Sequence, residues 1–205
     1  VAFALRLKQL GNQIQTVVGG RAVHPVNTLI GGFGKIPGHQ TIESLRKDLL
    51  NVIDPLIGAV GLVSSIEVPE WAARPNLFVA LRPPRDDFGL RGQNICTSDG
   101  AEYPVERYRD ALREFSVEHS HARHAALDSG ETYMVGSLAR LALWGDRLCG
   151  RAAEAFGALF PGGAVDNVLL NTRAQVVETV FSVESAIESC EVLLGFDETE
   201  AERHE

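Results

Sequence analysis

The segment Gly19–Pro37, which reads GGRAVHPVNTLIGGFGKIP, constrains this chain more than any other because it cannot form a regular helix. Proline fixes its own φ and disfavours helical backbone in the residue before it, so Pro25 and Pro37 favour extended conformations there. Glycine tolerates positive φ, and Gly19-Gly20 therefore ends the helix that precedes the segment. The segment is predicted to be a shaped loop, and such loops often carry functional residues.

The same loop contains one arginine and one histidine among apolar side chains. Because four of its residues are apolar, we expect the loop to pack inward and to place Arg21 and His24 in a partly buried position. From residue types alone, a buried ion pair for Arg21 and a turn role for His24 explain the segment without any chemistry, and spacing alone favours this structural interpretation. The apolar residues are Val26, Leu29, Ile30 and Phe33.

Helical periodicity lies on both sides of this loop. Apolar residues at helical spacing predict a helix over residues 1–18 and a second helix from an N-cap at Thr41 to about Val60. Pro55 lies inside the second pattern, so we expect a kink or a break near Asp54. A third helix is predicted from Val168 to about Leu194, capped by Asp166 or Asn167, and we expect it to pack against the first.

The middle of the chain has a different character. Residues 76–82 and 93–97 read as strands of a small antiparallel sheet, and residues 104–115 read as a helix. The predicted fold class is α+β, mainly α, with long packed helices and a small antiparallel sheet region. Residues 1–68 and 137–196 are expected to form a helical core, and residues 69–136 a sheet-containing subdomain with one helix.

Composition excludes some classes of function. The net charge of −8 argues against a nucleic-acid groove, and a membrane span is not predicted because the sequence has no run of 18 apolar residues. Neither a membrane span nor a secretory signal is predicted, so a cytoplasmic protein is expected, and the three separated cysteines, which we interpret as buried thiols, suit a reducing compartment. Three histidines lie close together, but on a helix they would not share one face, so we predict no metal site there. They are His119, His121 and His124.

The loop motif GGR-x-x-HP followed by a glycine pair resembles the second signature region of nickel-iron hydrogenase large subunits, especially of the cytoplasmic, cofactor-coupled groups. The segment YMVGSLARL at residues 133–141 resembles the family's Y-x-VGPLAR-x element, with Ser137 where proline is usual. The segment NTRAQVVE at residues 171–178 resembles a later R-x-AR-x-x-E helix, with Gln175 where arginine is frequent. The resemblance covers nearly the whole chain and implies the fold of that subunit.

The resemblance also implies roles for particular residues. Arg21 and His24 would lie at the edge of the catalytic site, on a proton path or in the site wall, because imidazole and guanidinium groups suit proton handling. Neither would be a metal ligand. Arg140, Arg173 and Glu178 match further motif positions of the family.

The family binds its metals through two Cys-x-x-Cys pairs, and this sequence contains neither pair. We therefore expect residues 1–205 to be an internal portion of a hydrogenase large subunit, without a bound cofactor and inactive by itself, whose parent protein holds a nickel-iron centre. The expected partner is an iron–sulfur small subunit, and exposed apolar faces could drive self-association. The electron acceptor is not specified by these residues.

Two other interpretations stay open. The quinone-site subunit of respiratory complex I has a similar fold and natively lacks the metal cysteines. The chain could also be a non-enzymatic interaction domain derived from the same family. The GGR-x-x-HP run with its following Gly31-Gly32 pair favours the hydrogenase interpretation.

Overall fold

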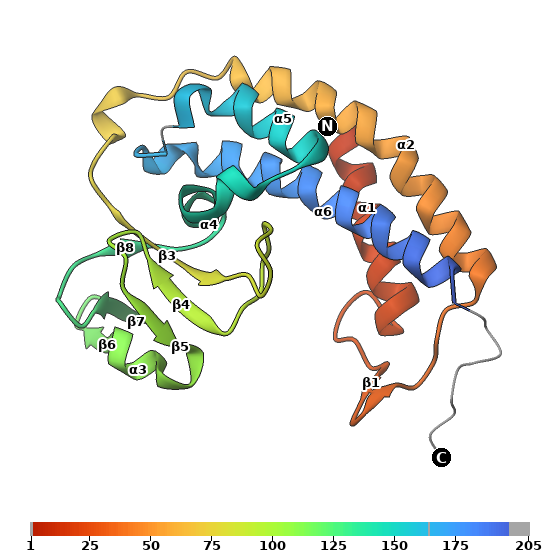
Figure 1. The fold of residues 1–205 in the computed structure, drawn as a ribbon, viewed down its shortest axis with the longest axis horizontal. Helices are drawn as coiled ribbons and strands as arrows, with labels where there is room; N and C mark the ends of the chain where they lie inside the picture. Colours follow the sequence, from red (N-terminus) through yellow and green to blue (C-terminus); the bar gives the residue numbers. More distant parts are fainter. Residues whose placement is uncertain (1, 164, 197–205) are drawn as a thin grey trace. The chain divides into compact units, whose positions relative to one another are not determined.

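The computed structural model of the chain describes residues 2–163 and 165–196 (Figure 1). Over these residues the protein is mainly helical α+β with small sheets, which confirms the predicted fold class. The helices are α1 (Ala2–Gly19), α2 (His39–Ser64), α3 (Tyr108–Ala111), α4 (Ser137–Trp144), α5 (Gly150–Leu159) and α6 (Asn171–Leu194), with short 3-10 turns η1 (Glu70–Ala72), η2 (Val105–Arg107), η3 (Gly145–Arg147), η4 (Pro161–Gly163) and η5 (Val168–Leu170). The strands are β1 (Thr28–Leu29), β2 (Gly32–Phe33), β3 (Leu77–Arg82), β4 (Asn94–Thr97), β5 (Glu102–Pro104), β6 (Leu112–Val117), β7 (Ser120–Leu127) and β8 (Tyr133–Met134).

The chain divides into two compact units. The first unit contains the residues up to Ala59 together with the chain from Ser182 onward, and the second contains Val60–Phe181. The division predicted from the sequence, residues 1–68 with 137–196 against residues 69–136, follows the change in secondary structure instead and stays a prediction. The described helices include none that is both long enough and apolar enough to cross a membrane.

The first unit contains α1, the loop that follows it and most of α2. Helix α1 ends at Gly19, as its glycine pair predicts. Helix α2 begins at His39, two residues before the predicted cap at Thr41, and it runs through Pro55 without ending there. The helix tolerates this proline because Pro55 and Asn51, whose carbonyl loses its intrahelical partner, are both exposed to water. Its buried stripe includes Leu45, Leu49 and Val52.

The second unit contains a four-stranded sheet in the order β5-β4-β3-β8. Neighbouring strands are antiparallel, as predicted, except for the parallel pair of β3 and β8. Val79, Ile95 and Leu127 form a buried cluster on this sheet. Trp144 of α4 lies against the sheet and donates a hydrogen bond from Nε1 to the Leu81 carbonyl at 3.0 Å.

The helix predicted over residues 104–115 is wrong. The chain there forms the end of β5, the turn η2 and the four-residue α3, and then continues as β6. Strand β6 pairs antiparallel with β7, with Leu112 opposite Leu127, and Leu112 packs on the buried cluster of the sheet. The apolar spacing fits a helix equally well, and this pairing between distant residues decides the outcome.

The histidine segment is therefore a hairpin rather than a helix. His119 lies in the turn between β6 and β7, and His121 and His124 lie on β7. The rings of His119 and His124 meet edge to face, with centroids 5.9 Å apart. These three side chains consequently do not have the helix geometry that was predicted for them.

Candidate functional site

The candidate site begins where α1 ends. Gly20 adopts a φ of 85°, and its N–H donates to the Thr16 carbonyl at 3.0 Å, which closes the last turn of the helix. A Cβ atom added at Gly19 would lie 2.9 Å from the Cβ of Pro25, closer than side-chain atoms approach. The glycine pair is thus required both by the left-handed turn and by the close approach of the loop to the helix end.

Arg21 and His24 meet inside this loop. The Nε of Arg21 donates a hydrogen bond to the His24 carbonyl oxygen at 2.5 Å. His24 has a φ of 52°, the one positive φ outside glycine among the described residues, and such a backbone costs a side chain about 1 kcal/mol or more. The structure therefore brings the two predicted residues together through the backbone of one and the side chain of the other.

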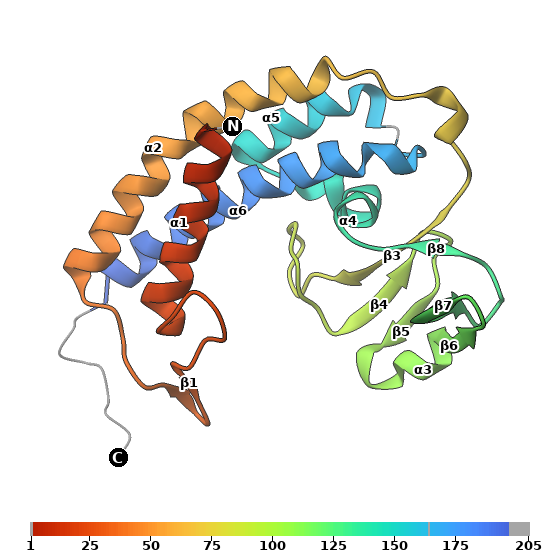
Figure 2. The same ribbon diagram turned by 180° about the vertical axis from the view of Figure 1, so that it is seen from behind.

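The prediction that this loop packs inward is wrong. Both Arg21 and His24 are exposed. The strands β1 and β2 contain only two residues each and form a hairpin that projects from the end of α1 (Figure 2), so its side chains are not covered by the described part of the first unit. Each of the four apolar side chains is more than half exposed, namely Val26, Leu29, Ile30 and Phe33.

A second group of predicted residues meets in the other unit. Glu178 of α6 is 9% exposed, and its carboxylate accepts hydrogen bonds from Arg140 Nε at 2.5 Å and Arg140 Nη2 at 2.8 Å. The Ser137 hydroxyl, at the position where the resembled family element usually has proline, donates to the same carboxylate at 2.5 Å. The hydrogen bond to Glu178 raises the pKa of Arg140, so this arginine stays charged and the pair is a salt bridge between α4 and α6.

Arg173 lies apart from this salt bridge and binds backbone instead. Its guanidinium donates to the carbonyls of Leu159 at 3.2 Å, Ser64 at 3.4 Å and Ile66 at 2.8 Å. Leu159 is the last residue of α5 and Ser64 the last of α2, so the positive charge sits at two helix C-termini. Among the described residues, the Nε of Arg173 is buried without a hydrogen-bond partner. Arg173 thus joins three chain segments.

Two asparagines that were not predicted from the sequence organise these sites. Asn27 bonds to backbone at both ends of the loop, and the Asn171 side chain accepts the Leu138 N–H at 3.2 Å, near the start of α4. Asparagine is frequent wherever a side chain must satisfy backbone groups in turns and at helix ends. This preference of asparagine could have indicated both residues from the sequence, but it does not predict which backbone groups they bind.

The donor side chains of the described residues do not form a metal site. No group of three or more His, Cys, Asp or Glu side chains within 2–163 and 165–196 is arranged to hold a metal ion. Cys96 lies on β4, Cys149 precedes α5 and Cys190 lies on α6, so the thiols come from separate elements. Cys96 and Cys190 are buried as expected, but Cys149, the residue before α5, is exposed.

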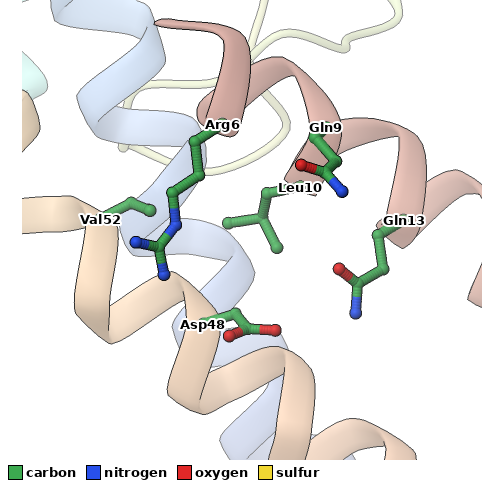
Figure 3. A pocket seen from close by; sticks show the side chains of 6 residues that line it. All are labelled: Arg6, Gln9, Leu10, Gln13, Asp48 and Val52. Carbon is green, nitrogen blue, oxygen red and sulfur yellow. The ribbon is translucent and has the colours of Figure 1, made fainter. Parts of the chain in front are cut away.

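A small surface pocket lies between α1 and α2. It has a volume of about 160 Å³, and Figure 3 shows the Arg6 side chain reaching from α1 toward Asp48 on α2, while Gln9 and Gln13 of α1 also line the pocket. Leu10 and Val52 are its apolar lining residues. None of the residues singled out in the sequence lines this pocket, so it is not the candidate site.

Comparison of the sequence with known proteins finds relatives among sulfhydrogenase alpha subunits. The chain is 35% identical over 191 residues to sulfhydrogenase 1 subunit alpha of Pyrococcus furiosus, covering 92% of this chain and 44% of the relative. It is 25% identical over 195 residues to sulfhydrogenase 2 subunit alpha of the same organism, covering 95% of this chain and 44% of the relative. No family model matches the sequence.

Solved structures share the fold. An NAD+-reducing [NiFe]-hydrogenase in the H2-reduced state superposes with a TM-score of 0.78 at 19% identity, covering 94% of this chain and 46% of that chain. A [NiFeSe] hydrogenase from Desulfovibrio vulgaris Hildenborough gives a TM-score of 0.64 at 17% identity, covering 95% and 49%. Over most of its length the chain is therefore homologous to part of the large (alpha) subunit of nickel-iron hydrogenases, and it spans less than half of these proteins.

Proposed function

We propose that this chain forms part of the catalytic large subunit of a nickel-iron hydrogenase, an enzyme that reversibly oxidises H2 to protons and electrons. The observation that carries the proposal is the 35% identity with a sulfhydrogenase alpha subunit over 92% of the chain. The GGR-x-x-HP loop, with its left-handed turn at Gly20 and its Arg21–His24 contact, supports it.

The residues of this chain do not by themselves fit a nickel-iron centre. Such a centre needs several convergent soft donors, whereas the three thiols here lie in separate elements. We therefore place the metal ligands in other segments of the longer protein, and we assign no step at the metals to this chain. The proposed cofactor belongs to the complete large subunit.

In this proposal, the chain's own residues handle protons and hold the scaffold. His24 accepts a proton and releases it to water at the exposed surface of the loop, and Arg21 holds the His24 backbone. The Arg140–Glu178 salt bridge fixes α4 against α6, and Arg173 fixes the ends of α2 and α5. These three residues act as structural supports in our assignment, with no contact to substrate.

The proposal extends to partners and location. The exposed apolar side chains of the β1–β2 hairpin suit burial against another protein surface, for which an iron–sulfur small subunit or other parts of the large subunit are the candidates. In the absence of these partners, we expect the same surface to promote self-association. We place the protein in the cytoplasm. Its electron acceptor, whether nicotinamide, deazaflavin or ferredoxin, would bind to partner subunits.

The coding sequence that flanks this segment in the genome gives a simple test. Two Cys-x-x-Cys pairs, one on each side, would support the hydrogenase proposal. A complete gene without them would contradict it and would favour a quinone-site type subunit or a non-enzymatic interaction domain.

A second test uses the complete protein. We expect His24→Ala to slow H2-dependent dye reduction by up to about 10²–10⁴-fold, the usual range for loss of a general acid–base group, while nickel content stays unchanged. The control is His121→Ala, since His121 is an exposed histidine on β7. Equal rates for the two variants would refute the assignment of His24, and loss of nickel in His24→Ala would mean that this residue serves assembly instead.

A further inference from the structure

Asn27 occupies a special place in the loop that follows α1. Its side-chain Nδ2 donates one hydrogen bond to the Val18 carbonyl at 2.8 Å and another to the Lys35 carbonyl at 2.7 Å. Val18 lies in the last turn of α1, and Lys35 lies after β2, where the chain returns toward α2. Both N–H groups of this single carboxamide are therefore used to join the two ends of the loop.

The backbone of the same residue adds two more contacts. The Asn27 N–H donates to the Gly19 carbonyl at 3.0 Å, and the Asn27 carbonyl accepts from the Gly34 N–H at 2.8 Å. Asn27 is partly buried, although most of its neighbours are exposed. Arg21 and His24 lie between the points that these four hydrogen bonds tie together.

We propose that Asn27 is a positioning residue, which closes this loop and thereby fixes the place of Arg21 and the left-handed backbone of His24. The loop needs such a residue because its apolar side chains are exposed and contribute little burial to hold it. The purpose of the positioning rests on the proposed function. The positioning itself is a property of the chain, and it can be measured without hydrogenase activity.

The chemistry at this position demands an amide. The two acceptors that face Nδ2 are both carbonyl oxygens, so the side chain must supply two N–H donors at once. A carboxylate of the same shape supplies none and would bring a negative charge against two carbonyl dipoles. Asn27→Asp is therefore nearly isosteric and removes both side-chain bonds, which isolates their effect from packing.

The experiment compares Asn27→Asp with the matched control Asn12→Asp, which makes the same chemical change at an exposed position in the middle of α1. We expect trypsin to cleave after Arg21 and Lys35 about tenfold faster in Asn27→Asp than in the control at pH 7.5, because loss of two hydrogen bonds increases the open population of the loop by that order. Amide exchange at Gly34 should accelerate in parallel, with unchanged far-UV circular dichroism.

A pH readout separates positioning from general loss of stability. Protonation restores one donor to the introduced carboxyl group, so lowering the pH should recover part of the Gly34 amide protection in Asn27→Asp. The carboxyl should titrate above the usual aspartate value of about 3.9, because the facing carbonyls disfavour its charge, and the control should titrate near that value. A structural defect without this hydrogen-bond geometry would not recover.

Equal cleavage rates and equal Gly34 exchange in the two variants would overturn the proposal. If Asn27→Asp unfolds the chain, Asn27→Ser replaces it, since serine retains one donor. Trypsin should cleave the loop of that variant faster than the loop of the wild type. Cleavage at the wild-type rate would also overturn the proposal.

Discussion

Replacing Glu178 by glutamine tests the salt bridge between α4 and α6. The carboxylate accepts three hydrogen bonds, from Ser137 Oγ at 2.5 Å and from Arg140 Nε and Nη2 at 2.5 and 2.8 Å. The amide keeps the size of the side chain, but it loses the charge and presents an N–H group to donors. Glu178→Gln therefore leaves the Arg140 guanidinium without its counter-ion.

The expected magnitude follows from the burial of the two partners. Breaking a fully buried ion pair costs about 3–5 kcal/mol, and a hydrogen bond to a charged group contributes about 1.5–3 kcal/mol. The Glu178 side chain is 12% exposed, but that of Arg140 is 26% exposed, so water compensates part of the loss. We expect the free energy of unfolding to fall by about 2–3 kcal/mol, which is less than the loss of a fully buried ion pair.

The assay is urea denaturation followed by circular dichroism. With a slope of about 2–3 kcal/mol per molar urea, the expected loss moves the midpoint by about 1 M. Glu188→Gln is the control, because Glu188 is an exposed residue of the same helix and should change stability by no more than about 0.5 kcal/mol. Arg140→Met should lower the free energy of unfolding by less when it is added to Glu178→Gln than when it is made in the wild type. A midpoint for Glu178→Gln that matches the control would refute the reasoning.

Two further predictions concern thiols and an acidic residue. Iodoacetamide should modify the exposed Cys149 in the native protein much faster than the buried Cys96 and Cys190, because burial raises the pKa of both buried thiols. Equal rates of modification would contradict the structure. Hydrogen bonds lower the pKa of Glu102, with the largest effect from Asn94 and the next from Arg82. The contribution of Glu102 to stability is therefore fully present above about pH 4.3, the ordinary glutamate pKa, and is lost as the pH falls through the lower pKa of the folded protein. Asn94→Ala should raise that pKa in a carboxyl NMR titration, and an unchanged value would show that the asparagine contact is not responsible.

The long helices and the strands β3 and β4 could be predicted from the sequence because their signals are local. The apolar stripe of α2 and the glycine stop of α1 lie within one element, and β3 and β4 lie near turn residues. Asp166 or Asn167 was predicted as a cap, and the Asn167 side chain accepts the Leu169 N–H at 3.0 Å. These features need no knowledge of distant contacts.

The remaining features depend on distant partners. Residues 104–115 have helical spacing, but Leu112 pairs with Leu127 in the hairpin of β6 and β7. The apolar side chains of the Gly19–Pro37 loop suggested burial, although burial requires a covering surface, which the described part of their unit does not supply.

Within the candidate sites, spacing alone did not predict which side chains meet. Arg140 and Glu178 are 38 residues apart, and only their match to family motifs singled them out. The hydroxyl of Ser137 then joins their salt bridge at the position where the family usually has proline. Arg21 and His24 were predicted as neighbours in one loop, but their contact uses the His24 carbonyl rather than its imidazole ring.

The most direct measurement of the central proposal is isotope exchange by the complete protein that contains this chain. The protein would be purified without oxygen and incubated under D2 in H2O, and HD would be followed by mass spectrometry. This assay needs no electron acceptor, so it does not depend on which partner subunit is present. The proposal predicts steady HD formation that falls in His24→Ala and persists in His121→Ala. An absence of HD from a protein shown to contain stoichiometric nickel would contradict the assignment of this chain to a hydrogenase large subunit.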